Sequence, residues 1–124
     1  MLPDDLSAVA RRALGGFQVM ADHSWPHGES WVWELRSADG RFFLKQQRRT
    51  EVYLREKHAL QRWATALGSR GPELLACADD ERALLMSALP GTRAEGVNLS
   101  VSEQRELHRQ AGELLARLMQ ARPK

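Results

Sequence analysis

The stretch RFFLKQQRRTEVYLREKHAL, residues 41–60, contains a predicted strand, a short polar connection and the first turns of a predicted helix. Side chains of a strand alternate between the two faces of its sheet. Phe43 and Lys45 therefore share one face, and Phe42 and Leu44 share the other. This alternation predicts a β-strand over residues 41–46 with one cation on an otherwise aromatic face.

The helix that follows is predicted to run from Thr50, which suits an N-cap position, to Gly68. Helix positions separated by four or seven residues lie on the same side. One acid, Glu56, consequently falls on the apolar side, together with Leu60, Trp63 and Leu67. The opposite, polar side is formed by Glu51, Arg55, His58 and Arg62.

Glu56 has two ways to satisfy its charge on this apolar side. Its carboxylate can bend outward to water, or it can meet a cation inside the protein. A carboxylate removed from water without a partner costs several kcal/mol. Lys45 is a strand lysine that could extend to water by itself, but each charge supplies what burial of the other requires. We therefore predict an ion pair between Lys45 and Glu56.

The remaining elements follow from hydrophobic periodicity and turn residues. We predict helices at 4–14 and 102–121, the latter with Ser102 as N-cap, and strands at 17–21, 31–36, 73–80 and 82–89. Three strands, a helix and two further strands joined by short connections predict a five-stranded antiparallel sheet with one packed helix. The predicted fold class is α+β, in a single domain of residues 1–124 with additional N-terminal and C-terminal helices.

The composition narrows the class of protein. The 124 residues include 18 basic and 16 acidic side chains, a net charge of +2, without a concentrated basic block, so nucleic acid binding is not predicted. No apolar run is long enough for a membrane span, and no membrane association is predicted. The single cysteine, Cys77, lies in an apolar run and is predicted to be a small core residue of a cytoplasmic protein. The histidines lack metal-ligand spacing, so no metal site is predicted within the chain.

Several short motifs occur in a characteristic order: GES at 28–30, FFLK at 42–45, LREKHAL at 54–60, GPELL at 71–75, LLMSALPG at 84–91 and AGELLARLMQ at 111–120. A strand lysine held by a helix glutamate is the arrangement of kinase N-lobes. With these motifs, residues 17–121 resemble the N-terminal lobe of the aminoglycoside phosphotransferase and choline kinase-like small-molecule kinases. The resemblance implies a kinase N-lobe-like fold, with the nucleotide-binding N-lobe at 17–91.

The resemblance implies ATP as the ligand, at a site formed by Gly28, Ser30, Val32, Phe43, Lys45, Glu56, Met86, Ser87 and Leu89. It implies that Lys45 binds the α- and β-phosphates, that Glu56 orients Lys45, and that Ser30 and nearby backbone N–H groups touch the β-phosphate. The hinge backbone at Ser87 and Leu89 would meet the adenine edge. Apolar walls would come from Val32, Met86 and Phe43, the last bulkier than the residue usual at its position.

In this family, a second lobe provides a His-Gly-Asp segment, a following Asn and a metal-binding Asp. Residues 1–124 contain no such set, so Mg²⁺ is expected only with that lobe, and the chain is predicted to be inactive alone, without a catalytic residue. One interpretation is the nucleotide-binding half of an ATP-dependent antibiotic or metabolite kinase. The alternative is a stand-alone, non-catalytic binding or dimerisation domain. The expected partners are a nucleotide and either the second lobe or a second copy, through the last helix.

Overall fold

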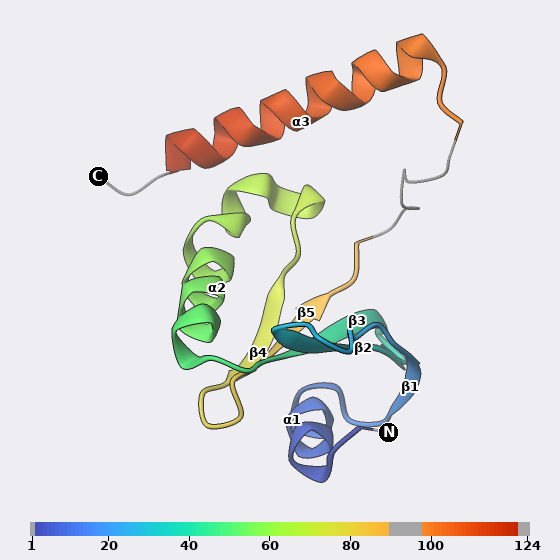
Figure 1. The fold of residues 1–124 in the computed structure, drawn as a ribbon. Helices are drawn as coiled ribbons and strands as arrows, with labels where there is room; N and C mark the ends of the chain where they lie inside the picture. The colour runs from blue at the N-terminus through green and yellow to red at the C-terminus, as the bar shows by residue number, and fades with distance from the viewer. Residues whose placement is uncertain (1, 90–97, 122–124) are drawn as a thin grey trace.

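The computed structural model describes residues 2–89 and 98–121. The elements follow the order α1 (Asp4–Leu14), β1 (Phe17–Asp22), β2 (Ser30–Ser37), β3 (Gly40–Gln47), α2 (Thr50–Arg62), a 3-10 helix η1 (Ala64–Arg70), β4 (Leu74–Ala78), β5 (Ala83–Ser87) and α3 (Val101–Ala121). The predicted α+β class is confirmed (Figure 1). The predicted end of the N-lobe, at Pro90 and Gly91, lies outside the described residues.

The five strands form one antiparallel sheet in the order β1-β2-β3-β5-β4. The strand with the lysine, β3, is central, between β2 and β5. The β2–β3 hairpin is paired from Ser30 opposite Gln47 to Ser37 opposite Gly40, where Gly40 has a φ of 126°. This is the five-stranded antiparallel sheet that the sequence predicts, in the arrangement of a kinase N-lobe.

Helix α1 covers one face of the sheet (Figure 1). Two acids in its first turn complement the helix dipole, and Gly15, with a φ of 74°, ends it. Its apolar side packs against one set of alternating strand residues. The buried core on this side consists of Leu2, Leu6, Val9, Ala10, Trp33, Leu35, Phe42, Leu44, Ala83 and Leu85.

Helix α2 packs on the opposite face, where the other set of strand residues points. Its Tyr53 and Leu60 form a second, smaller core with Leu84 of β5. Lys45 lies directly opposite Leu84 in the β3–β5 pairing, so the lysine belongs to the α2 face. The sequence predicts one covered face, and the structure shows that helices cover parts of both.

The end of α2 differs from the prediction. The α-helix ends at Arg62, and the 3-10 helix η1 follows it. As a result, the residue that packs against the Leu84 core is Ala64 rather than Trp63. The prediction that Trp63 lies on a buried helix side is wrong, because the residue is 39% exposed. Its ring lies 6.0 Å from the His58 ring in an edge-on arrangement. The predicted polar side is confirmed, since Glu51, Arg55, His58 and Arg62 are all exposed.

Two further predictions are corrected. Cys77 is exposed rather than in the core, because β4 is an edge strand whose Ala76 and Ala78 are the residues that pack against the α1 core. The N-cap of α3 is Ser100 rather than Ser102. The Ser100 hydroxyl accepts from the Glu103 N–H at 3.1 Å, and the Ser100 N–H donates to Glu103 Oε1 at 3.0 Å. This reciprocal pair is a capping box.

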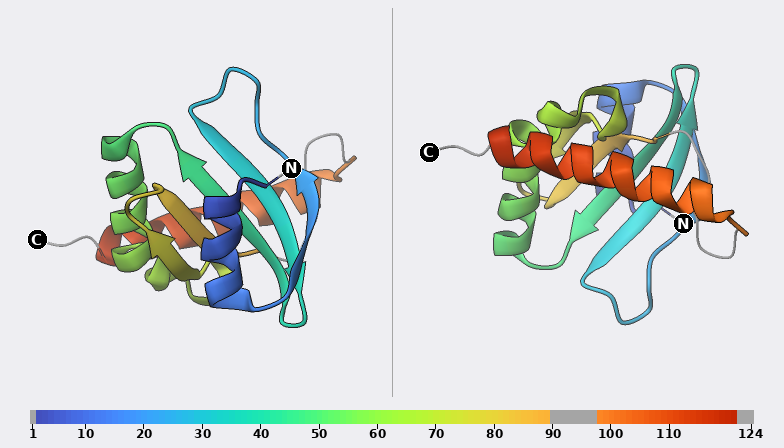
Figure 2. Two further views of the ribbon diagram at one scale, coloured as in Figure 1. Left: turned by 90° about the horizontal axis from the view of Figure 1, so that it is seen from below. Right: turned by 90° about the horizontal axis from the view of Figure 1, so that it is seen from above.

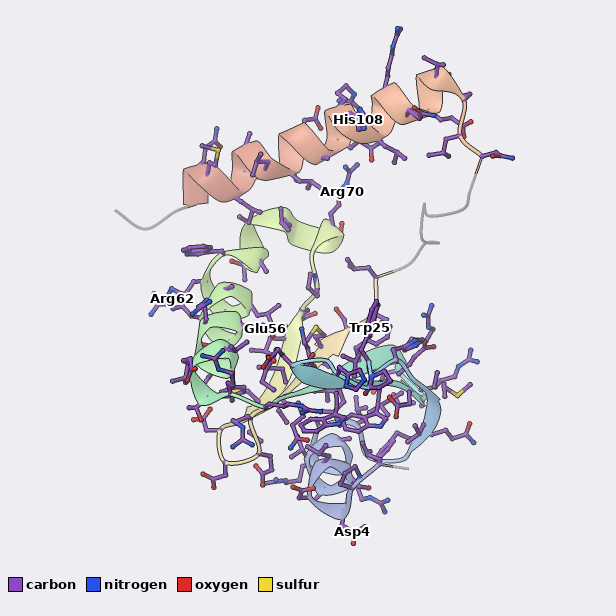
Figure 3. The ribbon with its side chains drawn as sticks, viewed as in Figure 1. Asp4, Trp25, Glu56, Arg62, Arg70 and His108 are labelled. Carbon is purple, nitrogen blue, oxygen red and sulfur yellow. The ribbon has the colours of Figure 1, made fainter. Side chains whose placement is uncertain are left out.

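Helix α3 runs across η1, away from the sheet (Figures 1 and 2). Arg70 of η1 points toward α3 (Figure 3), and its Nη1 donates to Gln110 Oε1 at 3.4 Å. Of the leucines of α3, Leu114 and Leu118 are half-buried, whereas Leu107 and Leu115 are exposed. Within residues 2–89 and 98–121, no helix combines the length and the apolar character needed to cross a membrane.

Candidate functional site

The predicted ion pair is present between β3 and α2. Lys45 Nζ donates to Glu56 Oε1 at 3.0 Å, and the two side chains are 28% and 25% exposed. Glu56 lies on the sheet side of α2 (Figure 3). Both groups are partly desolvated, so each charge lowers the cost of placing the other away from water. The contact joins the central strand to the helix above it.

A second donor, Gln47, holds the same carboxylate. Its amide Nε2 donates to Glu56 Oε2, and the residue is 3% exposed. The strand predicted from the sequence ends at residue 46, so Gln47 is not among the predicted site residues. The signal was available in the alternation, because a residue two positions after Lys45 on a strand lies on the same face.

The backbone of Gln47 is fixed by one residue of the β4–β5 turn, Arg82. The Gln47 N–H donates to the Arg82 carbonyl at 2.9 Å, and Arg82 Nε donates to the Gln47 carbonyl, also at 2.9 Å. Arg82 has a φ of 53°, a left-handed conformation that side chains other than glycine rarely adopt. No pattern in the sequence points to this contact, which joins residues 35 apart.

Three residues, Tyr53, Lys57 and Asp79, form a clamp between α2 and the turn that joins β4 to β5. Asp79 Oδ1 accepts from the Tyr53 hydroxyl at 2.6 Å and from Lys57 Nζ at 2.9 Å. These two hydrogen bonds lower the pKa of Asp79, that from Tyr53 most. Burial, and then the contact with Asp79, raises the pKa of Tyr53. The clamp fixes the helix that positions Glu56.

The predicted apolar walls share the face that carries Lys45. Val32 lies opposite Lys45 in the β2–β3 pairing, and Phe43 lies opposite Met86 in the β3–β5 pairing. All four of these side chains are half-buried. The structure therefore brings the cation and the three wall residues together on one partly open sheet surface.

The same face continues into a charged cluster that is not among the predicted site residues. Glu34 lies opposite Phe43, and its carboxylate meets His23 Nε2 at 3.0 Å and Arg41 Nε at 3.3 Å. The hydrogen bond with His23, followed by the charge of Arg41, lowers the pKa of Glu34. The His23 ring also lies 5.9 Å from the Phe43 ring. These polar groups border the apolar wall.

The loop that contains Gly28 and leads from β1 to Ser30 of β2 is the predicted phosphate loop, since Ser30 and nearby N–H groups are predicted to touch the β-phosphate. The Val32 N–H donates to the Ser24 hydroxyl at 2.8 Å, and the Gly28 N–H donates to the Trp25 carbonyl at 3.0 Å. A Cβ atom on Gly28 would lie 3.2 Å from Trp25 Cβ and 3.3 Å from its carbonyl oxygen. Glycine therefore suits this tight turn. Ser30, the first residue of β2, lies opposite Gln47. It is two positions before Val32 and therefore shares the face of the sheet that carries Lys45.

The predicted hinge residues lie at the end of β5. Ser87 is tied to the edge strand, because its N–H donates to the Glu73 carbonyl and its hydroxyl accepts from the Glu73 N–H, both at 2.9 Å. Leu89 is 42% exposed. Both residues also line a cavity of about 780 Å³ between η1, the end of α2 and β4. Neither Lys45 nor Glu56 lines that cavity, so this hollow is separate from the ion pair.

No cluster of three or more His, Cys, Asp or Glu side chains suited to a metal ion occurs in the part of the chain that the structure describes.

Comparison with models of protein families matches residues 26–124 to the model described as the phosphotransferase enzyme family. The match extends from the loop before β2 through α3, and α1 and β1 precede it. Comparisons with curated proteins and with solved structures give no match.

Proposed function

Because the chain belongs to the phosphotransferase enzyme family, we propose that it binds ATP as the N-lobe of a small-molecule phosphotransferase of the aminoglycoside or metabolite O-kinase type. The observation that supports this most is the ion pair of Lys45 and Glu56 on a partly open sheet face. A lysine ammonium has three N–H donors, and Glu56 Oε1 accepts one. The others can meet phosphate oxygens as charge-assisted donors.

The surroundings of Lys45 suit the other parts of the nucleotide. Val32, Phe43 and Met86 offer an apolar surface for the adenine ring beside the cation. The role assigned to Ser87 needs only its carbonyl oxygen, since its N–H already donates to Glu73. The loop with Gly28 and Ser30 lies near the Lys45 end of β2 and would hold the β-phosphate.

The chemistry assigned to this chain is binding and orientation. Phosphoryl transfer is accelerated chiefly by positioning and by stabilising charge on the phosphate oxygens. Lys45 would withdraw charge from the α- and β-phosphates, and Glu56 would keep the ammonium pointed at them. Mg²⁺, when bound, neutralises phosphate charge, and we assign its ligands and the catalytic Asp to a second lobe.

Titration calorimetry with Mg-ATP tests this proposal. We expect the wild-type chain to bind and Lys45→Ala to bind at least about tenfold more weakly, the loss expected for a charge-assisted contact to phosphate. Arg49→Ala is the matched control. It also removes one positive charge, a few residues after Lys45 in the chain, but this charge belongs to an exposed ion pair with Glu51. Equal affinities of the two variants would contradict the proposal.

Exposed apolar residues of α3 favour a second candidate, a partner-binding role. Leu107, Leu115 and Met119 are 44%, 58% and 68% exposed. We propose that a second lobe or a second copy of the chain covers these residues, since exposed apolar surface favours association. Gel filtration with and without Mg-ATP separates the candidates: a monomer that binds nucleotide supports the kinase lobe, and a dimer that ignores nucleotide supports the stand-alone binding domain.

A further inference from the structure

We propose that Gln47 is a positioning residue for Lys45, that it acts through Glu56, and that Arg82 holds it in place. The consequence for nucleotide binding rests on the proposed function. The contacts themselves do not.

The two oxygens of the Glu56 carboxylate are held by two donors from one strand. Lys45 donates to Oε1, and Gln47 donates to Oε2. A carboxylate held by a single donor can rotate about its last bond, whereas one held at both oxygens cannot do so without losing a hydrogen bond. Gln47 therefore fixes the direction in which Glu56 presents Oε1 to the lysine.

Because Gln47 is buried, water cannot easily replace its amide as a donor to Glu56. Gln47 is 3% exposed, while Lys45 and Glu56 retain about a quarter of their exposure. The amide must turn its NH₂ group toward the carboxylate, because its oxygen would repel the negative charge. Without that donor, Glu56 Oε2 would be left poorly solvated, and the pair could relax toward water.

Arg82 fixes the position of Gln47 at the end of β3. A terminal strand residue frays unless its backbone is held, and here both the N–H and the carbonyl of Gln47 are bonded to Arg82. Arg82 adopts its left-handed conformation while making these two contacts. Gln47 also lies opposite Ser30, which joins the predicted phosphate loop to the same end of the sheet.

The neighbouring glutamine provides a matched control. Gln46 belongs to the same strand and points to the other face, where its Nε2 donates to the Glu81 carbonyl at 3.0 Å. Gln46→Leu and Gln47→Leu therefore make the same chemical change one residue apart. Only Gln47→Leu removes a donor from Glu56. Arg82→Lys is a second variant, which keeps the Gln47 amide but removes the guanidinium contact to its backbone.

The primary readout is the exchange of the Lys45 ammonium protons with water, followed by ¹⁵N NMR without nucleotide. We expect Gln47→Leu to speed this exchange about three- to tenfold, as for loss of one charge-assisted hydrogen bond. Arg82→Lys should change it less, in the same direction, and Gln46→Leu should leave it unchanged. Backbone amide spectra verify that each variant is folded. If the exchange is unchanged in both Gln47→Leu and Arg82→Lys, the positioning role is overturned.

The second readout is Mg-ATP affinity, which we expect to fall about three- to tenfold in Gln47→Leu and to stay unchanged in Gln46→Leu. The two measurements test the proposed function and the positioning role separately. A wild-type chain that does not bind Mg-ATP overturns the proposed function, while faster Lys45 exchange in Gln47→Leu still supports the positioning role. Normal ATP affinity in Gln47→Leu overturns the link from positioning to nucleotide binding.

Discussion

Glu56 lies between two donors of different kinds, a charged ammonium and a neutral amide, and this determines what single substitutions cost. Removal of Lys45 leaves the carboxylate partly buried, with Gln47 as its one remaining donor among residues 2–89 and 98–121. Replacement of Glu56 by glutamine removes the negative charge but keeps a group that can hydrogen bond. The first change should therefore be more costly than the second.

We expect Lys45→Ala to lower the free energy of unfolding by about 1–2 kcal/mol, because it leaves a partly desolvated charge without its cation. In a Glu56→Gln background, the same substitution should cost less. Urea denaturation of the two single variants and the double variant measures this coupling. Additive effects would show that the two side chains do not stabilise each other.

At the scale of elements, α2 depends on the β4–β5 turn for its position. Asp79 lies in that turn, and its pKa falls below the usual 3.8 because Tyr53 and Lys57 donate to it. A lowered carboxylate pKa stabilises the folded state above the pKa of the unfolded chain. That contribution disappears as the pH falls through the folded value.

We therefore expect Asp79→Asn to be less stable than the wild type at neutral pH, and the difference to shrink as the pH falls below about 4. Thermal unfolding followed by circular dichroism between pH 2 and pH 7 measures it. Asp80→Asn is the matched control, because it makes the same change at the next residue of the turn and leaves both donors to Asp79 in place. A gap between wild type and Asp79→Asn that stays constant down to pH 2 would exclude the carboxylate as its source.

The β2–β3 hairpin depends on a glycine for its conformation rather than for space. Gly40 has a φ of 126°, yet nothing lies within 4 Å of a Cβ atom built on it. Gly40→Ala should lower the free energy of unfolding by about 1–3 kcal/mol through backbone strain alone. Gly16, also in open space but without a left-handed φ, is the control. Gly16→Ala should be neutral or stabilising by up to about 1 kcal/mol. Equal effects in guanidinium denaturation would contradict this explanation.

At the scale of the whole molecule, the sheet is stabilised from a segment outside the family match. Helix α1 ends before residue 26, where that match begins, yet its buried side chains complete the larger of the two cores. The face that holds Lys45 therefore depends on a helix that packs on the opposite side of the same strands.

Leu6 is fully buried in α1, and Leu54 of α2 is 51% exposed. We expect Leu6→Ala to lower the free energy of unfolding by about 2–5 kcal/mol, through lost burial and the cavity left behind. Leu54→Ala should cost less than about 1 kcal/mol. Urea denaturation compares the two. If Leu6→Ala were as mild as Leu54→Ala, α1 would not be an integral part of the core.

Local periodicity predicted much of this fold and part of the site. The alternation around Lys45 and the unusual place of Glu56 on its helix were both visible within twenty residues of sequence, and the pair is present. The contacts of Gln47 with Arg82 and of Tyr53 with Asp79 were not predictable, because they join residues that only the folded sheet brings together. Cys77 and Trp63 were misplaced for a related reason. Apolar character does not reveal that β4 is an edge strand or that α2 stops at Arg62.

Lys45 and Gln47 both reach Glu56 because they are two positions apart on one strand. A deletion of a single residue between the hairpin turn and Lys45 would shift β3 by one step against its neighbours. The ammonium would then be forced into the hydrocarbon packed beneath α1, and Gln46 would take the place of Lys45 opposite the acid. A change of two residues in length would keep each side chain of β3 on its face, whereas a change of one would not. Insertions and deletions of one residue in this hairpin should therefore be far more harmful than substitutions at its exposed positions.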